Sequence, residues 1–201
     1  MKVSGLFDQF DNLEQILVED LTKWLKPPHN LITIQNALAN RIFYPQVVPV
    51  TLEELDFDLG LLREALKSKP QFLDKVSKKI LIPEDFIKTF PNLDSLVWAF
   101  VDALLFNLPK DTNSCLWTVV EAGNLRILGT VLFPQFEGNG QMQLRLDGKN
   151  FMLKRGSLAI FHCQKSHCHL NFRLTSGQIL GLKEGVVEIY GGELGLMIDG
   201  R

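Results

Sequence analysis

The sequence predicts an α+β protein, in which a helical region at residues 1–112 precedes a small antiparallel β sandwich or barrel at residues 113–201. In the first region the apolar residues recur every three or four positions, which is the period of an amphipathic helix. After Asn113 they alternate with smaller or polar residues and are interrupted by Gly, Asn and Asp, as in short strands joined by turns. A block of helices followed by a block of strands is the ordering of α+β proteins.

Each expected helix has a start signal followed by an apolar stripe. The clearest start is Thr51 with Glu54, which have the spacing of a capping box, and the helix that follows is expected to reach about Lys67. Prolines separate several of the helices, because proline lacks the N–H that a helix interior requires. The other expected helix starts are Asp11, Thr33, Pro70, Pro83 and either Asn92 or Asp94.

Some eight strands are expected in the second region, at a spacing of roughly ten residues. Two glycine-containing turns support this prediction. Asp147-Gly148 is a hairpin signal, and Gly191-Gly192 predicts that the last two strands pair as a hairpin. The run at 78–82 fits either a strand or an extended crossing. The expected strands are 116–121, 125–133, 141–146, 150–153, 157–163, 167–174, 186–190 and 193–198.

The composition is that of a folded, soluble protein. Hydrophobic residues make up 46% of the chain, charged residues make up 22%, and the formal net charge is -2. This balance gives no electrostatic reason to expect nucleic acid or a membrane as partner. No apolar run approaches the length of a membrane span, and three cysteines are too few for a disulfide framework. We therefore expect a cytoplasmic protein.

The densest group of potential metal ligands is the run from position 162 to 169. It contains His162, Cys163, His167, Cys168 and His169, which are weak candidates for a metal site. If the residues between the two cysteines form a hairpin loop, strand alternation places the cysteines on one face and His162 and His169 on the other. A tetrahedral zinc ion needs four ligands that converge. We therefore expect a solvated hairpin tip, and no metal or other cofactor.

The remaining candidate groups are expected to be structural. Cys115 has no base near it in the sequence and is interpreted as a packed thiol. The acidic positions 53, 54, 56 and 58 belong to the first turns of one helix, where they are expected to be solvated and favoured by the helix dipole. The three tryptophans are expected in the core. No catalytic residue is predicted.

Several segments share the pattern of one known family. They are Arg155–Leu158, the glycines at 177, 181 and 185, and the run Gly191–Arg201. Upstream segments at 36–41, 51–54, 61–66, 101–104 and 128–130 continue it. On these residues the chain resembles the carboxy-terminal part of the glutamate mutase L family, which are actin-like ATPases of the sugar-kinase and heat-shock-chaperone superfamily.

The chain also departs from that family. The family's amino-terminal ATPase half has no counterpart, and Lys79–Glu84 stands where the family has a Gly-rich turn. A backbone cradle for phosphate needs glycines that allow close approach. The resemblance therefore implies a non-catalytic interaction, assembly or chaperone-like module. The alternative is a small-molecule-binding protein or enzyme that uses a pocket between the helical region and the β domain.

The last strand is the expected interaction site. If it lies at a sheet edge, its free backbone groups are a template for a protein partner or for self-association. The expected interaction residues are Glu193, Leu194, Met197 and Asp199, with Leu196 and Ile198 facing the core. The alternative is that the strand is central and that its neighbours satisfy its backbone.

Overall fold

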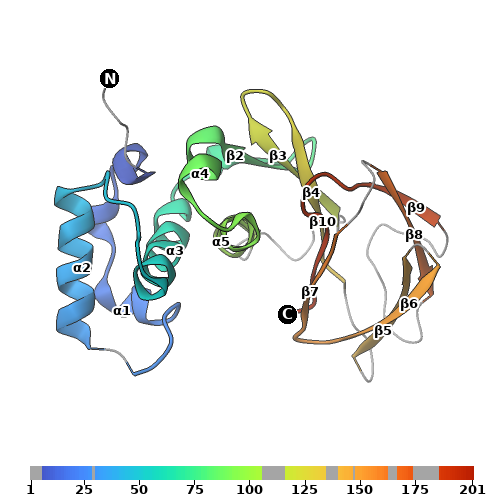
Figure 1. The fold of residues 1–201 in the computed structure, drawn as a ribbon, viewed down its shortest axis with the longest axis horizontal. Coiled ribbons are helices and arrows are strands. Elements are labelled where there is room, and N and C mark those ends of the chain that lie inside the picture. Colours follow the sequence, from blue (N-terminus) through green and yellow to red (C-terminus); the bar gives the residue numbers. More distant parts are fainter. Residues whose placement is uncertain are drawn as a thin grey trace. The chain divides into compact units, whose positions relative to one another are not determined.

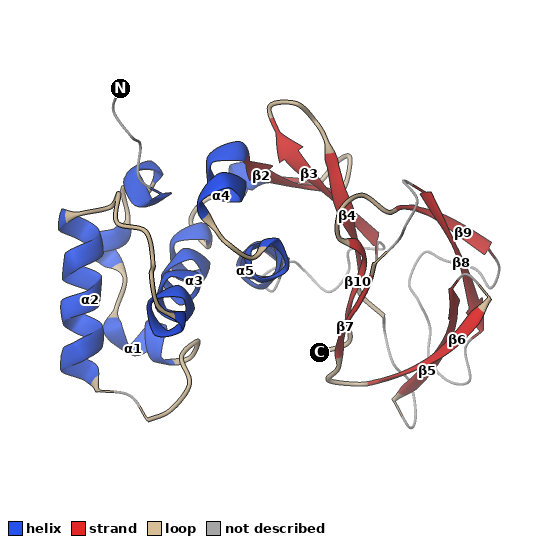
Figure 2. Ribbon diagram, in the orientation of Figure 1, coloured by secondary structure: helices blue, strands red, loops and turns tan. Residues whose placement is uncertain are grey.

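The structure is a computed structural model of the chain, and it describes residues 6–28, 30–105, 116–134, 140–146, 148–162, 167–173 and 186–201. The chain divides into two compact units. The helical unit comprises Met1–Phe72 and Pro83–Asn107, and the β unit comprises Leu73–Ile82 and Leu108–Arg201. Figure 1 traces the chain in sequence colours, and Figure 2 colours helices blue and strands red. The described helices belong to the first unit.

The helical unit has five α-helices in its described residues, built around a core of leucine and phenylalanine. Phe86 packs edge-on against Phe10, Phe72 and Phe100, with ring centroids 5.7 to 6.4 Å apart. Short 3₁₀ turns at Leu6–Gln9 and Leu13–Gln15 precede the first α-helix, and a third lies at Pro70–Phe72. The helices are α1 (Val18–Thr22), α2 (Leu31–Phe43), α3 (Leu52–Leu66), α4 (Glu84–Thr89) and α5 (Leu93–Leu105).

The helix starts were predicted with mixed success. The capping box of α3 is confirmed, since the Thr51 hydroxyl accepts from the Glu54 N–H at 3.1 Å and the Glu54 carboxylate accepts from the Thr51 N–H at 3.2 Å. The cap of α2 was wrongly placed at Thr33, because the Asn30 side chain accepts from the backbone N–H groups of the first turn. Asn92 caps α5 by accepting from the Ser95 N–H at 2.9 Å.

Two other helix predictions were wrong. Asp11 caps no helix and forms an ion pair with Lys69, with 2.5 Å between Nζ and Oδ1. The segment after Pro70 makes only one 3₁₀ turn before it becomes a strand. In the described part of the chain, no helix combines the length and the apolar character that crossing a bilayer requires.

The described strands of the β unit form two sheets. One has the order β1-β2-β3-β4-β10-β7, and the other has the order β6-β5-β8-β9. Each of the eight predicted strands is present with bounds shifted by a few residues at most. The strands are β1 (Leu73–Asp74), β2 (Lys79–Pro83), β3 (Leu116–Ala122), β4 (Ile127–Leu132), β5 (Gln141–Leu146), β6 (Lys149–Lys154), β7 (Leu158–Phe161), β8 (His167–Arg173), β9 (Val186–Tyr190) and β10 (Gly195–Asp199).

The sheet arrangement corrects the predicted β architecture. The larger sheet is mixed, because β10 runs parallel to β4 and antiparallel to β7. Neither strand order closes on itself in the described residues, so these strands form no barrel. The segment at 73–82, which the prediction assigned to the helical region, contributes β1 and β2 to the larger sheet.

The predicted hairpin between the last two strands does not form. β9 pairs with β8 in the smaller sheet, whereas β10 lies in the larger one, so the turn at 191–194 carries the chain from one sheet to the other. Gly192 has φ +58°, and a Cβ at this position would lie 2.5 Å from the carbonyl carbon of Leu128. Gly192 therefore permits a close approach to β4, where the prediction assigned the glycine pair to a hairpin turn.

The two sheets share one hydrophobic core. Apolar side chains from both sheets pack together in it, and alternate residues of β10 contribute to it, as the period of a strand requires. Phe151 and Phe161 contact each other at its margin, with ring centroids 4.5 Å apart. The buried members are Leu132, Met142, Leu144, Leu146, Leu153, Ile189, Leu196 and Ile198.

Candidate functional site

The helical unit carries a long segment without exposed charge. From Asn30 to Leu52 the only Asp, Glu, Lys or Arg is Arg41, although charged residues make up 22% of the whole chain. The Arg41 side chain is buried, at 7% exposure. This segment comprises α2, the connection that follows it and the first residue of α3.

α2 is amphipathic in an unusual way. Its buried face consists of Ile34, Leu38 and Arg41, at the spacing of one side of a helix. The opposite face is exposed and carries apolar and amide side chains, whereas a surface helix ordinarily presents charged residues there. Figure 1 shows α2 beside α1 in the helical unit, with its other side facing away from that unit.

Large apolar side chains on this segment are exposed to solvent. Phe43 is 76% exposed, and Val50 is 86% exposed. Exposed large apolar side chains are concentrated in this segment, and exposed apolar patches on a folded protein are typical of interaction sites. We call this set the uncharged surface; its members are Leu31, Ile32, Phe43, Tyr44, Val47, Val48, Val50 and Leu52.

A buried ion pair anchors α2 to α3 beneath the uncharged surface. The Arg41 guanidinium donates to both carboxylate oxygens of Asp58, at 2.7 and 3.1 Å. Burial raises the pKa of Asp58 from 3.8 to about 6, and the hydrogen bonds and charge of Arg41 oppose this rise without cancelling it. The prediction that the acidic positions of this helix are all solvated was therefore wrong for Asp58, which is fully buried.

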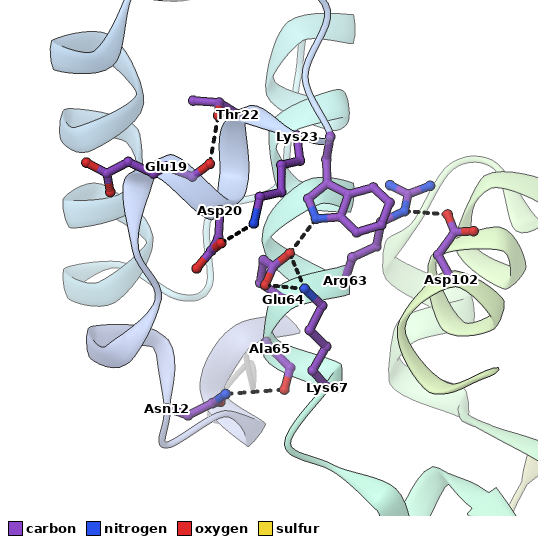
Figure 3. Close-up of polar contacts among 11 residues, drawn as sticks. Asn12, Glu19, Asp20, Thr22, Lys23, Arg63, Glu64, Ala65, Lys67 and Asp102 are labelled. Carbon is purple, nitrogen blue, oxygen red and sulfur yellow. Dashed lines mark hydrogen bonds and ion pairs between the residues drawn. The ribbon is translucent and has the colours of Figure 1, made fainter. Parts of the chain in front are cut away.

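A second polar cluster joins α3 to its neighbours in the helical unit. The Trp24 indole N–H donates to Glu64 at 2.5 Å, and Lys67 donates to both oxygens of the same carboxylate at 2.7 Å. Arg63 donates to Asp102 of α5 at 2.7 Å. Figure 3 shows Arg63 and Lys67 projecting from one side of α3, and the guanidinium lies 5.1 Å from the centroid of the Trp24 ring.

This cluster is a structural link between helices. The Glu64 carboxylate accepts from an indole and an ammonium group, and Arg63 combines an ion pair with a cation–π contact. The charged side chains of this cluster pair with one another. The tryptophans differ in burial: Trp117 is buried in β3, whereas Trp24 and Trp98 are half-buried.

The five metal candidates are not assembled by a hairpin. His162 follows β7, which pairs with β10 in the larger sheet. The backbone of His167 to His169 lies in β8 of the smaller sheet, opposite β9. Cys163 lies outside the described residues, as does Cys115. Among the residues that the structure describes, no group of three or more His, Cys, Asp or Glu is placed to hold a metal ion.

The four expected interaction residues lie on or next to a central strand. β10 has β4 on one side and β7 on the other, so its backbone is paired along both edges. Leu194 is 2% exposed, Met197 is 0% and Asp199 is 8%, whereas the Glu193 side chain is 58% exposed and lies near Arg126. The expectation of an edge strand was wrong, and the alternative of a central strand is confirmed.

Comparison with known proteins adds no relative. No family model, no curated protein and no solved structure matches this chain.

The uncharged surface is the feature that the sequence prediction missed. The sequence contains a signal for it: residues 30–52 include a single charged residue, although the average composition of the chain predicts several. The sequence predicted an apolar stripe on each helix and no exposed apolar face.

Proposed function

We propose that this chain is a non-catalytic protein-interaction module of the assembly or chaperone-like kind, and that a protein partner binds at the uncharged surface. The observation that carries this proposal is the exposure of eight large apolar side chains on a segment whose only charge is buried. The centres of protein interfaces are depleted in charge and enriched in aromatic residues, and Phe43 and Tyr44 are exposed here.

The same surface argues for the class of partner. A nucleic-acid site would need Lys or Arg to neutralise phosphates, and this surface offers none. Burial of its apolar side chains against another apolar surface lowers the free energy, because it removes them from water. A protein with a complementary apolar face is therefore the partner that this chemistry fits.

Site-specific photo-crosslinking in the full chain tests the proposal. A photoreactive residue replaces Ile32 or Val48 in the uncharged surface, and Val76, which is 94% exposed in the β unit, is the matched control position. We expect a defined protein adduct from positions 32 and 48, none from position 76, and loss of the adduct when Phe43→Glu is added. Adducts of equal yield at all three positions, or none at positions 32 and 48, would refute the proposal.

A relationship to the glutamate mutase L family is part of the proposal. It rests on the sequence segments that resemble the carboxy-terminal part of that family. If the relationship holds, the structure of a family member should contain the order β3-β4-β10-β7 with a parallel central pair. A family structure in which the corresponding last strand pairs as a hairpin with the preceding strand would contradict it.

A further inference from the structure

We infer that the uncharged surface binds a second copy of this chain, with two α2 helices packed antiparallel across a two-fold axis. This inference rests on the proposed function, because it names the partner of the same surface. Three features of α2 support it: the positions that form its exposed stripe, the sizes of the side chains along that stripe, and the absence of charge.

The exposed stripe of α2 is self-complementary. Ile32, Asn36, Ala39 and Phe43 follow one another at intervals of four, three and four residues, so they lie on one side of the helix; Ala39 is half-buried and the other three are exposed. In an antiparallel pair centred between positions 37 and 38, Ile32 of one copy meets Phe43 of the other, and Asn36 meets Ala39. Such matching of a surface to its own image is what a two-fold interface requires.

The side-chain sizes also fit a helix pair. The large residues stand at the two ends of the stripe, and the smallest, Ala39, stands next to the axis, where the two helices approach most closely. Asn36 places one amide in an otherwise apolar contact.

The absence of charge favours a second copy over a charged partner. A two-fold axis brings each surface against itself, so a cluster of like charges on the surface would meet the same charges on the other copy. The exposed face of α2 has no Asp, Glu, Lys or Arg. A surface selected for a charged partner would carry the opposite charge around the contact.

A contact along α2 alone is small. α2 has 13 residues and is about 20 Å long. Contacts that bury less than about 1,200 Å² in total belong to weak and transient complexes. We therefore expect a dimer that dissociates in the micromolar range, and the oligomeric state should depend on the protein concentration.

Sedimentation equilibrium of the full chain between about 1 and 300 μM tests the inference. We expect a monomer at the low end and a dimer at the high end. Ile32→Glu or Phe43→Glu should weaken the dimer about 30-fold, as for a residue that contributes strongly to an interface. Thr33→Glu adds a carboxylate to the same helix away from the stripe and should leave the association unchanged. Circular dichroism should show each variant folded, because the replaced side chains are exposed.

A charge exchange tests the antiparallel geometry. In the double variant Ile32→Glu/Phe43→Lys, opposite charges meet twice across the axis, whereas in Ile32→Lys/Phe43→Lys like charges meet twice. We expect the first double variant to dimerise at least about tenfold more tightly than the second. A parallel pair would bring position 32 against position 32 and would remove this difference.

The results separate this inference from the proposed function. A chain that stays monomeric at 300 μM, or a dimer that none of the α2 variants weakens, would overturn the inference. If the same chain still forms an adduct with a different protein at position 32, the proposed function stands with another partner. A chain that neither dimerises nor forms an adduct would refute both.

Discussion

α3 of the helical unit and β10 of the β unit are both largely buried. Residues close in the sequence position α3, whereas residues far away in the sequence position β10. α3 begins with a capping box made by residues three positions apart, and its apolar face follows from its own period. β10 pairs with β4, in which Gly129 is the partner of Gly195, and with β7 on its other edge. The first element is specified locally, whereas the second depends on partners distant in the chain.

This difference predicts how strongly a substitution destabilises each unit. A change at a helix start removes one local interaction and has a limited effect. A change in the backbone of β10 affects three strands at once, because β10 holds β4 and β7 together.

Met197→Pro should unfold the β unit. Met197 lies in the middle of β10, opposite Val131 and Ile160, and proline removes a backbone donor from a strand that is paired on both edges. We expect a loss of at least about 3 kcal/mol in the free energy of unfolding, measured by urea denaturation followed by circular dichroism. Met197→Leu keeps the donor and the volume and should cost less than about 1.5 kcal/mol. A folded β unit in the proline variant would contradict the central position of β10.

Asp58→Ala should destabilise the helical unit by about 3 to 5 kcal/mol, because it leaves the Arg41 guanidinium buried without its partner. The double variant Arg41→Met/Asp58→Leu should recover most of this loss, since a buried ion pair gains little over apolar side chains of similar volume. Urea denaturation of the two variants and the wild type measures the difference. Equal losses in the single and double variants would contradict the ion-pair explanation.

The same pair predicts a pH dependence. The pKa of Asp58 is about 6 in the folded chain and 3.8 in the unfolded chain, so between these values the folded state binds more protons. The free energy of unfolding should therefore fall by about 3 kcal/mol as the pH rises from about 4 to 6, and this contribution should be constant above that range. The double variant Arg41→Met/Asp58→Leu should lack this slope, and the difference between the two pH profiles isolates it.

Gly192→Ala should cost about 2 kcal/mol or more, because a Cβ at this position meets the backbone of Leu128 at 2.5 Å and φ is +58°. Gly148→Ala is the matched control. Its φ is +80°, but a Cβ there meets nothing within 4 Å, so only the conformational cost of about 1 kcal/mol applies. Thermal unfolding of both variants compares them. Equal losses would show that the close approach to β4 adds nothing.

Thr51→Ala should destabilise the helical unit by about 1 kcal/mol through loss of the capping hydroxyl. Thr33→Ala should have almost no effect, because Asn30 caps α2. A larger effect at position 33 than at position 51, in the same denaturation experiment, would contradict the assignment of the two caps.

The elements were predictable where their signals are local. The α3 capping box and the eight strands were found because each depends on residues a few positions apart. The partner of each strand was not predictable, because the pattern of Val187 and Ile189 is the same whether β9 pairs with β8 or with β10. The Gly191-Gly192 pair suggested a hairpin, since glycine serves equally for a tight turn and for a close backbone contact.

The candidate site followed the same rule. The buried position of Asp58 depends on Arg41 of another helix, so the local pattern of acidic residues gave the wrong answer. The exposed stripe of α2 could have been read from the sequence by counting charges. Its exposure could not, because Phe43 and Ile32 are residue types that are ordinarily buried.

Concentration-dependent hydrogen exchange tests the central claim that α2, and not the terminal strand, is the interaction surface. The full chain is compared at about 2 and 200 μM, and exchange of the backbone amides is followed by mass spectrometry. We expect the amides of α2 and of residues 44–52 to exchange more slowly at the higher concentration, while those of β10 are unchanged. Slower exchange in β10 or β7 with α2 unchanged, or no change in any segment, would contradict the claim.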